Sequence, residues 1–132
     1  MALQYSQTVL NARLDQVQTT TGSAPLLKIY TGAVPTNCAT AATGTLLASF
    51  ALPASWMNAA SAGVKTKAGT WSGTGSAAGT AGYCRITDST GTTVHVQGTA
   101  GIASGDFSFD NTSIAVSQVV TVNTFTLTAA NV

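Results

Sequence analysis

The sequence has very few charged residues. Aspartate is its only acidic residue, with 4 copies, and Lys and Arg together number 5, so charged side chains make up 7% of the 132 residues. Typical globular proteins have about 25%. Nucleic-acid binding draws most of its affinity from clustered cations, whereas those of this chain are scattered. The cations are Arg13, Lys28, Lys65, Lys67 and Arg85. Because they form no cluster in the sequence, we expect no nucleic-acid partner.

Long apolar runs and a signal peptide are also missing. The N-terminal stretch MALQYSQTVL has neither a positive n-region nor an apolar h-region, and no run approaches the ~20 apolar residues of a membrane span. We therefore expect no membrane partner and no export. Without export, Cys38 and Cys84 are expected to be free thiols, and neither lies in a spacing typical of a zinc site.

Groups for acid–base or nucleophilic chemistry are scarce, and His95 is the only histidine. In the hairpin TDSTGTTVHVQG, the DSTG turn with Gly91 in a left-handed conformation predicts that Asp88 pairs with Thr92. That register places His95 opposite Arg85 on the outer face. A general base usually has an orienting partner, and a neighbouring cation disfavours the protonated imidazole. We therefore expect no catalytic residue, no cofactor, no metal site and no enzymatic activity.

The first 22 residues predict the only helix of the chain. Apolar residues fall within one arc of a 3.6-residue wheel, Ser6 is placed to cap a shorter version, and Gly22 lies where a C-terminal cap belongs. Arg13 lies inside the arc, either with its stem along the apolar surface or facing a carboxylate of a partner. The arc consists of Leu3, Val9, Leu10, Leu14 and Val17.

After Gly22 the apolar pattern changes to period two. Residues 26–30 and 46–52 alternate as strands do, and Lys65 and Lys67 form a pair expected to face solvent on an edge strand. In SQVVTVNTFTLTA the parity of the apolar residues changes, which indicates either a bulge near Asn123 and Thr124 or a strand with two apolar faces. These patterns predict an all-β, antiparallel β-sandwich or jelly-roll-like domain of roughly seven or eight strands. We divide the chain into an N-terminal helical arm, 1–22, and a β-sandwich domain, 23–132.

Four stretches carry a resemblance to a known family: LLKIYTGAVP, GTLLASFALP, GTAGYCRITDSTGTTVHVQGTAG and DNTSIAVSQVVTVNTFTLT. In this order, behind a short helix, they resemble small proteins encoded among the virion genes of tailed bacteriophages and prophages. The resemblance spans most of the chain. It implies a non-enzymatic β-sandwich component that decorates or cements the outside of the capsid after synthesis in the host cytoplasm. The partners it implies are the major capsid protein and further copies of the chain, as a dimer or trimer.

Two surfaces are expected to make the capsid contact. The first is the helix stripe with its embedded arginine, and the second is an edge strand that accepts a further strand. Two other functions stay open: a head–tail or tail connector, and a glycan- or receptor-binding module with Trp56, Trp71 and Tyr83 as its platform. The stripe contact comprises Leu3, Leu10, Arg13, Leu14 and Val17, and the edge contact comprises Val64, Lys65, Thr66, Lys67 and Ala68.

Overall fold

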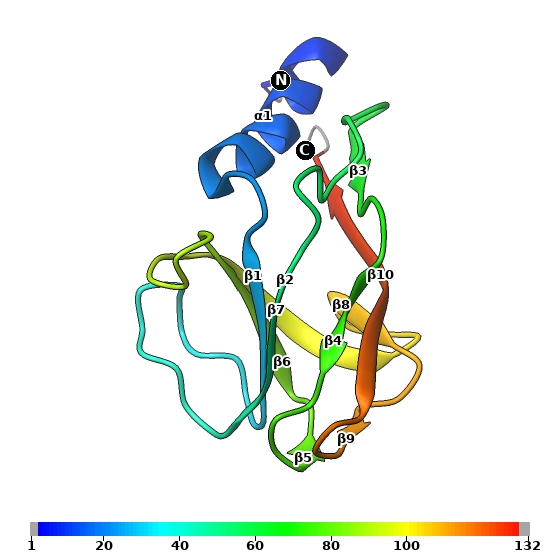
Figure 1. Ribbon diagram of the computed structural model, residues 1–132. Helices are drawn as coiled ribbons and strands as arrows, with labels where there is room; N and C mark the ends of the chain where they lie inside the picture. The colour runs from blue at the N-terminus through cyan, green and yellow to red at the C-terminus, as the bar shows by residue number, and fades with distance from the viewer. Residues whose placement is uncertain (1–2, 130–132) are drawn as a thin grey trace.

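The computed structural model describes residues 3–129 and confirms an all-β fold with one N-terminal helix (Figure 1). Within these residues the helix α1 (Gln7–Thr21) is followed by ten strands. The strands are β1 (Leu26–Tyr30), β2 (Leu46–Ala51), β3 (Val64–Thr66), β4 (Trp71–Thr74), β5 (Gly79–Thr80), β6 (Tyr83–Thr87), β7 (Val94–Ile102), β8 (Phe107–Phe109), β9 (Ser113–Ile114) and β10 (Val119–Thr128).

Eight of the strands form one sheet in the order β2-β1-β6-β7-β8-β10-β3, with β4 also paired to β10. The short β5 and β9 pair only with each other. The predicted antiparallel arrangement is wrong at one place, because β7 and β8 run parallel. The link between them turns back along the sheet through Ala103 and Gly105, which have φ of 51° and 77°, so that Phe107 lies beside Ala100.

The sheet curls until β2 and β4 meet. Ala48 forms an antiparallel bridge with Gly75, and the Ser76 amide donates to the Leu47 carbonyl at 2.7 Å. Because the curled sheet faces itself, the apolar residues of both halves share one core. Aromatic rings fill the core: Trp71 lies 5.9 Å from Trp56 and 5.4 Å from Phe125 between ring centres. The sandwich-like shape therefore rests on a single interior.

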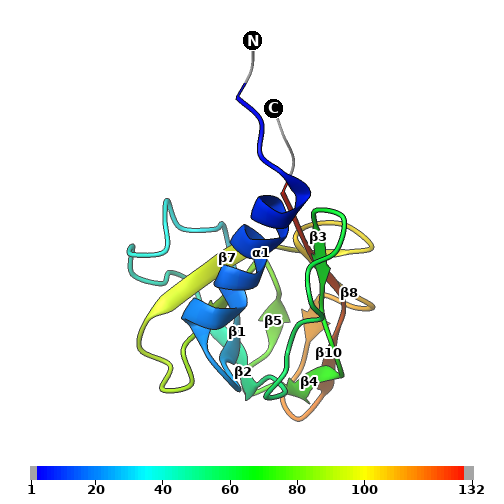
Figure 2. The ribbon, with the colours of Figure 1, turned by 90° about the horizontal axis from the view of Figure 1, so that it is seen from above.

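The helix α1 lies across one end of the strands, between β7 and β3 (Figure 2). Its start is later than the sequence pattern predicts, because Ser6 caps it by accepting a hydrogen bond from the Val9 amide at 3.2 Å. Leu3 therefore precedes the helix instead of forming its first turn. The predicted end at Gly22 is confirmed: this residue has φ of 92°, and its amide donates to the Gln18 carbonyl at 3.0 Å.

Of the two alternatives for the last strand, the structure has the bulge. The pairing of β10 with β8 shifts register between Val122 and Thr124. Val120, Val122 and Phe125 are all buried, and Leu127 packs against the same core. One extra residue therefore returns the apolar side chains of both halves of β10 to one face.

The predicted register of the β6–β7 hairpin is wrong by two residues. Ile86 pairs with Val96 and Arg85 pairs with Gln97, and the register shifts between Ile86 and Thr87. The turn is one residue longer than the pattern predicts, since the Asp88 amide donates to the carbonyl of Thr93, and the bulge adds another. Two single-residue shifts restore the alternation, so the apolar face is as predicted. His95, however, is not opposite Arg85.

Gly82 allows two loops to approach closely in front of β6. A Cβ at this position would collide with the carbonyl oxygen of Gly32. We expect Gly82→Ala to lower the free energy of unfolding by about 2 kcal/mol, as overpacking does. Gly22→Ala is the comparison, because there a Cβ meets no atom within 4 Å and only the positive φ opposes it. Urea unfolding of both variants measures the loss of unfolding free energy. An equal or smaller loss for Gly82→Ala than for Gly22→Ala would show that the close contact with Gly32 does not restrict the residue at position 82.

Candidate interaction surface

Packing of α1 against the sheet divides the predicted helix contact into two parts. Leu10 and Leu14 are 5% and 6% exposed, so the domain itself covers the centre of the stripe. Arg13 is exposed and Val17 is half-buried, while Leu3 is 74% exposed. Leu10 and Leu14 are thus not open to a partner in this structure. Leu3, Arg13 and Val17 are the predicted contact residues that a partner can reach.

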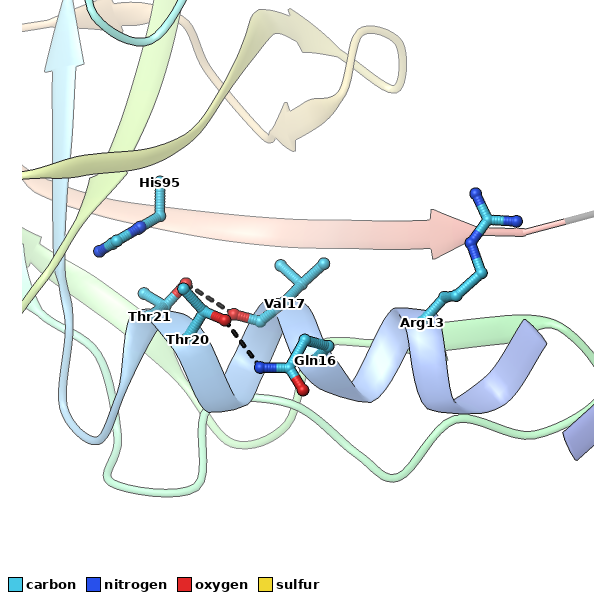
Figure 3. Close-up of a pocket in the computed structure, with 6 residues that line it drawn as sticks. All are labelled: Arg13, Gln16, Val17, Thr20, Thr21 and His95. Carbon is cyan, nitrogen blue, oxygen red and sulfur yellow. Dashed lines mark hydrogen bonds between the residues drawn. The ribbon is translucent and has the colours of Figure 1, made fainter. Parts of the chain in front are cut away.

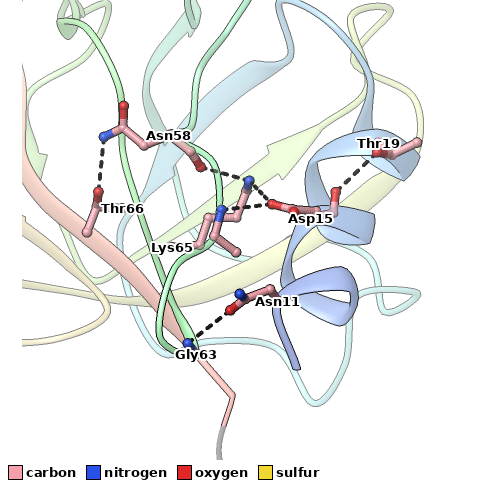
Figure 4. Close-up of polar contacts among 8 residues, drawn as sticks. Asn11, Asp15, Thr19, Asn58, Gly63, Lys65 and Thr66 are labelled. Carbon is pink, nitrogen blue, oxygen red and sulfur yellow. Dashed lines mark hydrogen bonds and ion pairs between the residues drawn. The ribbon is translucent and has the colours of Figure 1, made fainter. Parts of the chain in front are cut away.

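Lys65 holds the helix to the domain, and the prediction that it faces solvent is wrong. Its side chain is 1% exposed, and its Nζ lies 2.7 Å from Oδ1 of Asp15 and 2.8 Å from the Asn58 carbonyl (Figure 4). The hydrogen bond from Lys65, followed by that from the Ala60 amide, holds the pKa of Asp15 below its usual value. Beside them Asn11 accepts from the Gly63 amide. Helix α1 is therefore fixed by charge and hydrogen bonds as well as by apolar burial.

The edge strand β3 is less open than the sequence predicts. On one side it pairs with β10. On the other side the Asn58 amide donates to the Thr66 carbonyl at 2.9 Å, and Ser61 and Val64 exchange two backbone hydrogen bonds of 2.9 Å. Strand addition needs free backbone groups, and the segment 56–61 already occupies most of them. Further along, the Ala68 amide donates to the Trp56 carbonyl, so we do not retain residues 64–68 as a strand-addition site.

Side chains near the start of α1 form an exposed apolar surface, which we call the arm surface. Leu3, Tyr5 and Val9 are 74%, 43% and 41% exposed. The guanidinium carbon of Arg13 lies 5.3 Å from the centre of the Tyr5 ring, within the range of a cation–π contact. The arm surface comprises Leu3, Tyr5, Val9 and Arg13, and it combines large exposed apolar groups with one cation.

A groove of about 250 Å³ runs between α1 and β7, with Arg13 and His95 towards its opposite ends (Figure 3). Val17 lies between them, and Gln16, Thr20 and Thr21 complete the lining. Within residues 3–129, His95 has no hydrogen bond or ion pair that would orient its imidazole. The groove thus continues from Arg13 of the arm surface along the helix. Sequence analysis missed it, because the predicted hairpin register placed His95 opposite Arg85 and gave no reason to expect it near α1.

The aromatic residues of the glycan-binding alternative are buried. Trp56, Trp71 and Tyr83 are each 0% exposed. The Tyr83 hydroxyl donates to the Thr43 carbonyl at 2.6 Å, and its ring stacks on Tyr30 with 5.0 Å between centres. A sugar platform requires an exposed ring face, and these three side chains do not provide one. The platform named for this alternative is therefore wrong.

The two cysteines and Asp88 show no sign of an active site. Burial raises the pKa of the Cys84 thiol far above its usual value, and Cys38 is a half-buried free thiol. Hydrogen bonds, first from the Thr90 hydroxyl and then from the Thr92 amide, lower the pKa of Asp88 in the hairpin turn. Among residues 3–129 no three side chains of the His, Cys, Asp and Glu types lie together as metal ligands would.

Comparisons of the chain with protein-family models, with curated proteins and with solved structures give no match. In the described part of the chain no helix is both long and apolar enough to cross a membrane. The structure itself defines an all-β domain with a curled sheet and a helix fixed across one end. Large exposed apolar side chains occur in the arm surface and also at Ile102, Val116 and Val119.

Proposed function

We propose that this chain is a non-enzymatic structural protein of tailed-phage virions that decorates or cements the outside of the capsid. The observation that carries the proposal is the arm surface, where three large apolar side chains stay exposed beside an arginine. Exposed apolar groups gathered at one place are typical of protein–protein contact. The resemblance of four stretches to phage virion proteins gives the class of partner, the major capsid protein.

Rigid attachment of α1 suits such a contact. The Asp15–Lys65 ion pair and the buried Leu10 and Leu14 fix the helix to the sheet, so Val9 and Arg13 of the arm surface are presented in one orientation. A preorganised contact loses less conformational entropy on binding than a mobile one. Many copies, each binding weakly at a repeated site, resist rupture of a shell together because several interfaces must break at once.

The low charge of the chain is consistent with a place in an assembly. With 5 cations and 4 aspartates, copies of the chain repel one another weakly. Dimers or trimers on the shell would therefore encounter little electrostatic opposition. The oligomeric state is part of the proposal and is read by light scattering of the purified chain.

A head–tail or tail connector is the second candidate, because the exposed arm surface could contact a neighbouring subunit of a connector ring as well as a capsid subunit. The two differ in stoichiometry: a decorating protein is present in many copies, whereas a connector ring has few subunits. A glycan- or receptor-binding module is less favoured, since Trp56, Trp71 and Tyr83 are buried. Binding to a glycan array would restore that candidate through residues other than these three.

Substitutions on the arm surface are expected to weaken capsid binding. Leu3→Asp removes apolar area worth about 1.5–3 kcal/mol when buried, so binding to particles that lack this chain should fall at least about tenfold. Arg13→Glu should cause a similar loss by reversing the charge. The measurement is co-sedimentation of the purified variants with such particles.

Val116→Asp is the matched control for these variants. Val116 is 63% exposed and lies in the loop between β9 and β10, and β9 is at the end of the domain opposite α1 (Figure 1). This variant should bind as the unmodified chain does. Unchanged binding by both Leu3→Asp and Arg13→Glu would contradict the arm contact.

A further inference from the structure

Arg85 is a buried cation outside the arm surface. It lies on β6, is 3% exposed, and is held by neutral acceptors only. Its Nε donates to Gln97 Oε1 at 3.1 Å, and its Nη2 donates to the carbonyls of Thr40 at 2.7 Å and Asn37 at 3.4 Å. Buried charges in proteins are usually paired with an opposite charge. Arg85 keeps its full positive charge without such a pair.

The Nη1 nitrogen of Arg85 makes no hydrogen bond with the described residues. In residues 3–129 every fully buried side-chain nitrogen or oxygen has a hydrogen-bond partner. It follows that Nη1 is open to solvent. Arg85 contributes to the lining of a cavity of about 490 Å³ between the loop residues 38–41 and the hairpin residues 92–94, so a ligand in this cavity would meet the Arg85 side chain.

A second cation lies beside Arg85. Lys28 on β1 is paired directly with Arg85 on β6, so both side chains are on the same face of the sheet. The Lys28 Nζ donates to the Gly91 carbonyl at 3.1 Å, which places it next to the hairpin residues that line the cavity. Within residues 3–129 the one ion pair joins Lys65 to Asp15. No carboxylate oxygen therefore lies within 4.0 Å of a side-chain nitrogen of Lys28 or Arg85. Like charges directly opposite each other destabilise a sheet unless an anion compensates them.

One free neutral donor lies at the cavity. Thr93 lines it, and its hydroxyl makes no hydrogen bond with the described residues. Thr92 also lines it, but the Thr90 hydroxyl gives its proton to Oδ1 of Asp88 at 2.8 Å, so the Thr92 hydroxyl donates to Thr90 at 3.1 Å and is not a free donor. An arginine donor, a nearby lysine and a hydroxyl group are groups that recognise an oxyanion.

We propose that the cavity at Arg85 binds a small oxyanion, a phosphate or carboxylate group, with Arg85 and Lys28 supplying the charge and Thr93 a hydroxyl donor. The site is separate from the arm surface and does not depend on the proposed function. An anion bound here compensates two facing cations, and the folded chain is stabilised by the ligand through mass action.

The test uses the unmodified chain and inorganic phosphate. ¹⁵N-resolved NMR spectra are recorded during a phosphate titration at pH 7, with sodium chloride holding the ionic strength constant. We expect saturable shifts of the Thr92 and Thr93 amides and of Arg85 Nε, with a Kd of about 1 mM. A parallel titration with acetate distinguishes a phosphate from a carboxylate ligand, and saturation by either supports the site. Shifts that stay linear for both anions, or that chloride alone reproduces, would overturn the proposal.

Lys28→Met gives a second reading that keeps the Arg85 bonds in place. We expect it to weaken anion binding several-fold, because one of the two attracting charges is lost. Lys67→Met is the matched control: it removes the same charge, and the Lys67 Nζ donates to the Gly69 carbonyl instead of to the cavity hairpin. Equal weakening by the two variants would mean that net charge and not a site attracts the anion, and would count against the proposal.

Discussion

Asp15→Ala is expected to lower the free energy of unfolding by about 2–3 kcal/mol, because it leaves the buried Lys65 ammonium without its counter-ion. Among residues 3–129 only the Asn58 carbonyl, at 2.8 Å, remains as a partner of the Nζ atom, and the Ala60 amide also loses its acceptor. The Asp15 side chain is 47% exposed, so water can enter and keeps the loss below that of a fully buried pair. Urea unfolding at neutral pH measures it.

Substitution of the other partner, Lys65, distinguishes the cost of an unpaired buried charge from the cost of lost packing. Lys65→Met keeps most of the buried stem and leaves Asp15 half-exposed to water, so we expect a loss of less than about 1 kcal/mol. Losses of equal size in the two variants would contradict the assignment of the cost to an unpaired buried cation. Protection of α1 amides from hydrogen exchange should fall in Asp15→Ala and persist in Lys65→Met.

Acid should weaken the stabilisation that the Asp15–Lys65 ion pair gives to the folded chain. The hydrogen bond from Lys65 and that from the Ala60 amide lower the pKa of Asp15 below 3.8. The stabilisation is therefore present above the unfolded-state pKa and is lost as pH falls through the folded-state pKa. The advantage of the unmodified chain over Asp15→Asn should be largest near neutral pH and shrink below about pH 4, whereas Asp110→Asn, on an exposed aspartate, should leave the profile unchanged.

Trp71→Ala should have the largest effect of any single substitution considered, a loss of about 3–5 kcal/mol. Trp71 is 0% exposed, and its ring lies between Trp56 and Phe125. Its Nε1 donates to the carbonyls of Trp56 at 3.2 Å and Ala68 at 3.1 Å. Removal of the ring leaves a cavity and two carbonyls that lose a donor. Thermal or urea unfolding should show the variant to be largely unfolded near body temperature.

Trp71→Phe is the control, and it should lose clearly less because the aromatic contact remains. A stable Trp71→Ala chain would contradict the burial of this residue in the core. It would also reopen the glycan platform, which needs Trp71 at the surface. The prediction thus bears on stability and on the choice between functions.

The parts of the fold that could be predicted from the sequence are those set by local pattern. The caps at Ser6 and Gly22 and the bulge beside Asn123 follow from residue type and parity within one element. Gly91 has φ of 77°, as the hairpin turn requires. The left-handed conformation of Gly91 depends on few residues, so it could be predicted, whereas the turn itself is one residue longer than predicted.

Features that depend on two distant segments could not be predicted. Alternation along residues 64–68 places Val64 and Thr66 on one face of the strand and Lys65 on the other, but it does not show which face α1 covers. The helix covers the face of Lys65, which is 50 residues from Asp15 in sequence. The hairpin register failed because the bulge between Ile86 and Thr87 leaves no mark in the apolar pattern. In both cases tertiary packing decides between two locally equal choices.

The candidate site shows the same division. Leu3 and Arg13 were found by their place on a helical wheel, and Leu10 and Leu14 by the same criterion, although the domain buries the latter two. A wheel identifies an apolar stripe without showing whether the partner is the chain itself or another molecule. Tyr5 lies outside the arc, and only its stacking with Arg13 brings it into the arm surface.

The capsid-decoration proposal is tested most directly by quantitative mass spectrometry of purified virions from the phage or prophage that encodes the chain. The measured quantity is the number of copies per major capsid subunit. The account predicts on the order of hundreds of copies per particle, as repeated sites on a shell require. About a dozen copies or fewer would place the chain in a portal or tail ring, and absence of the chain from virions would contradict the account.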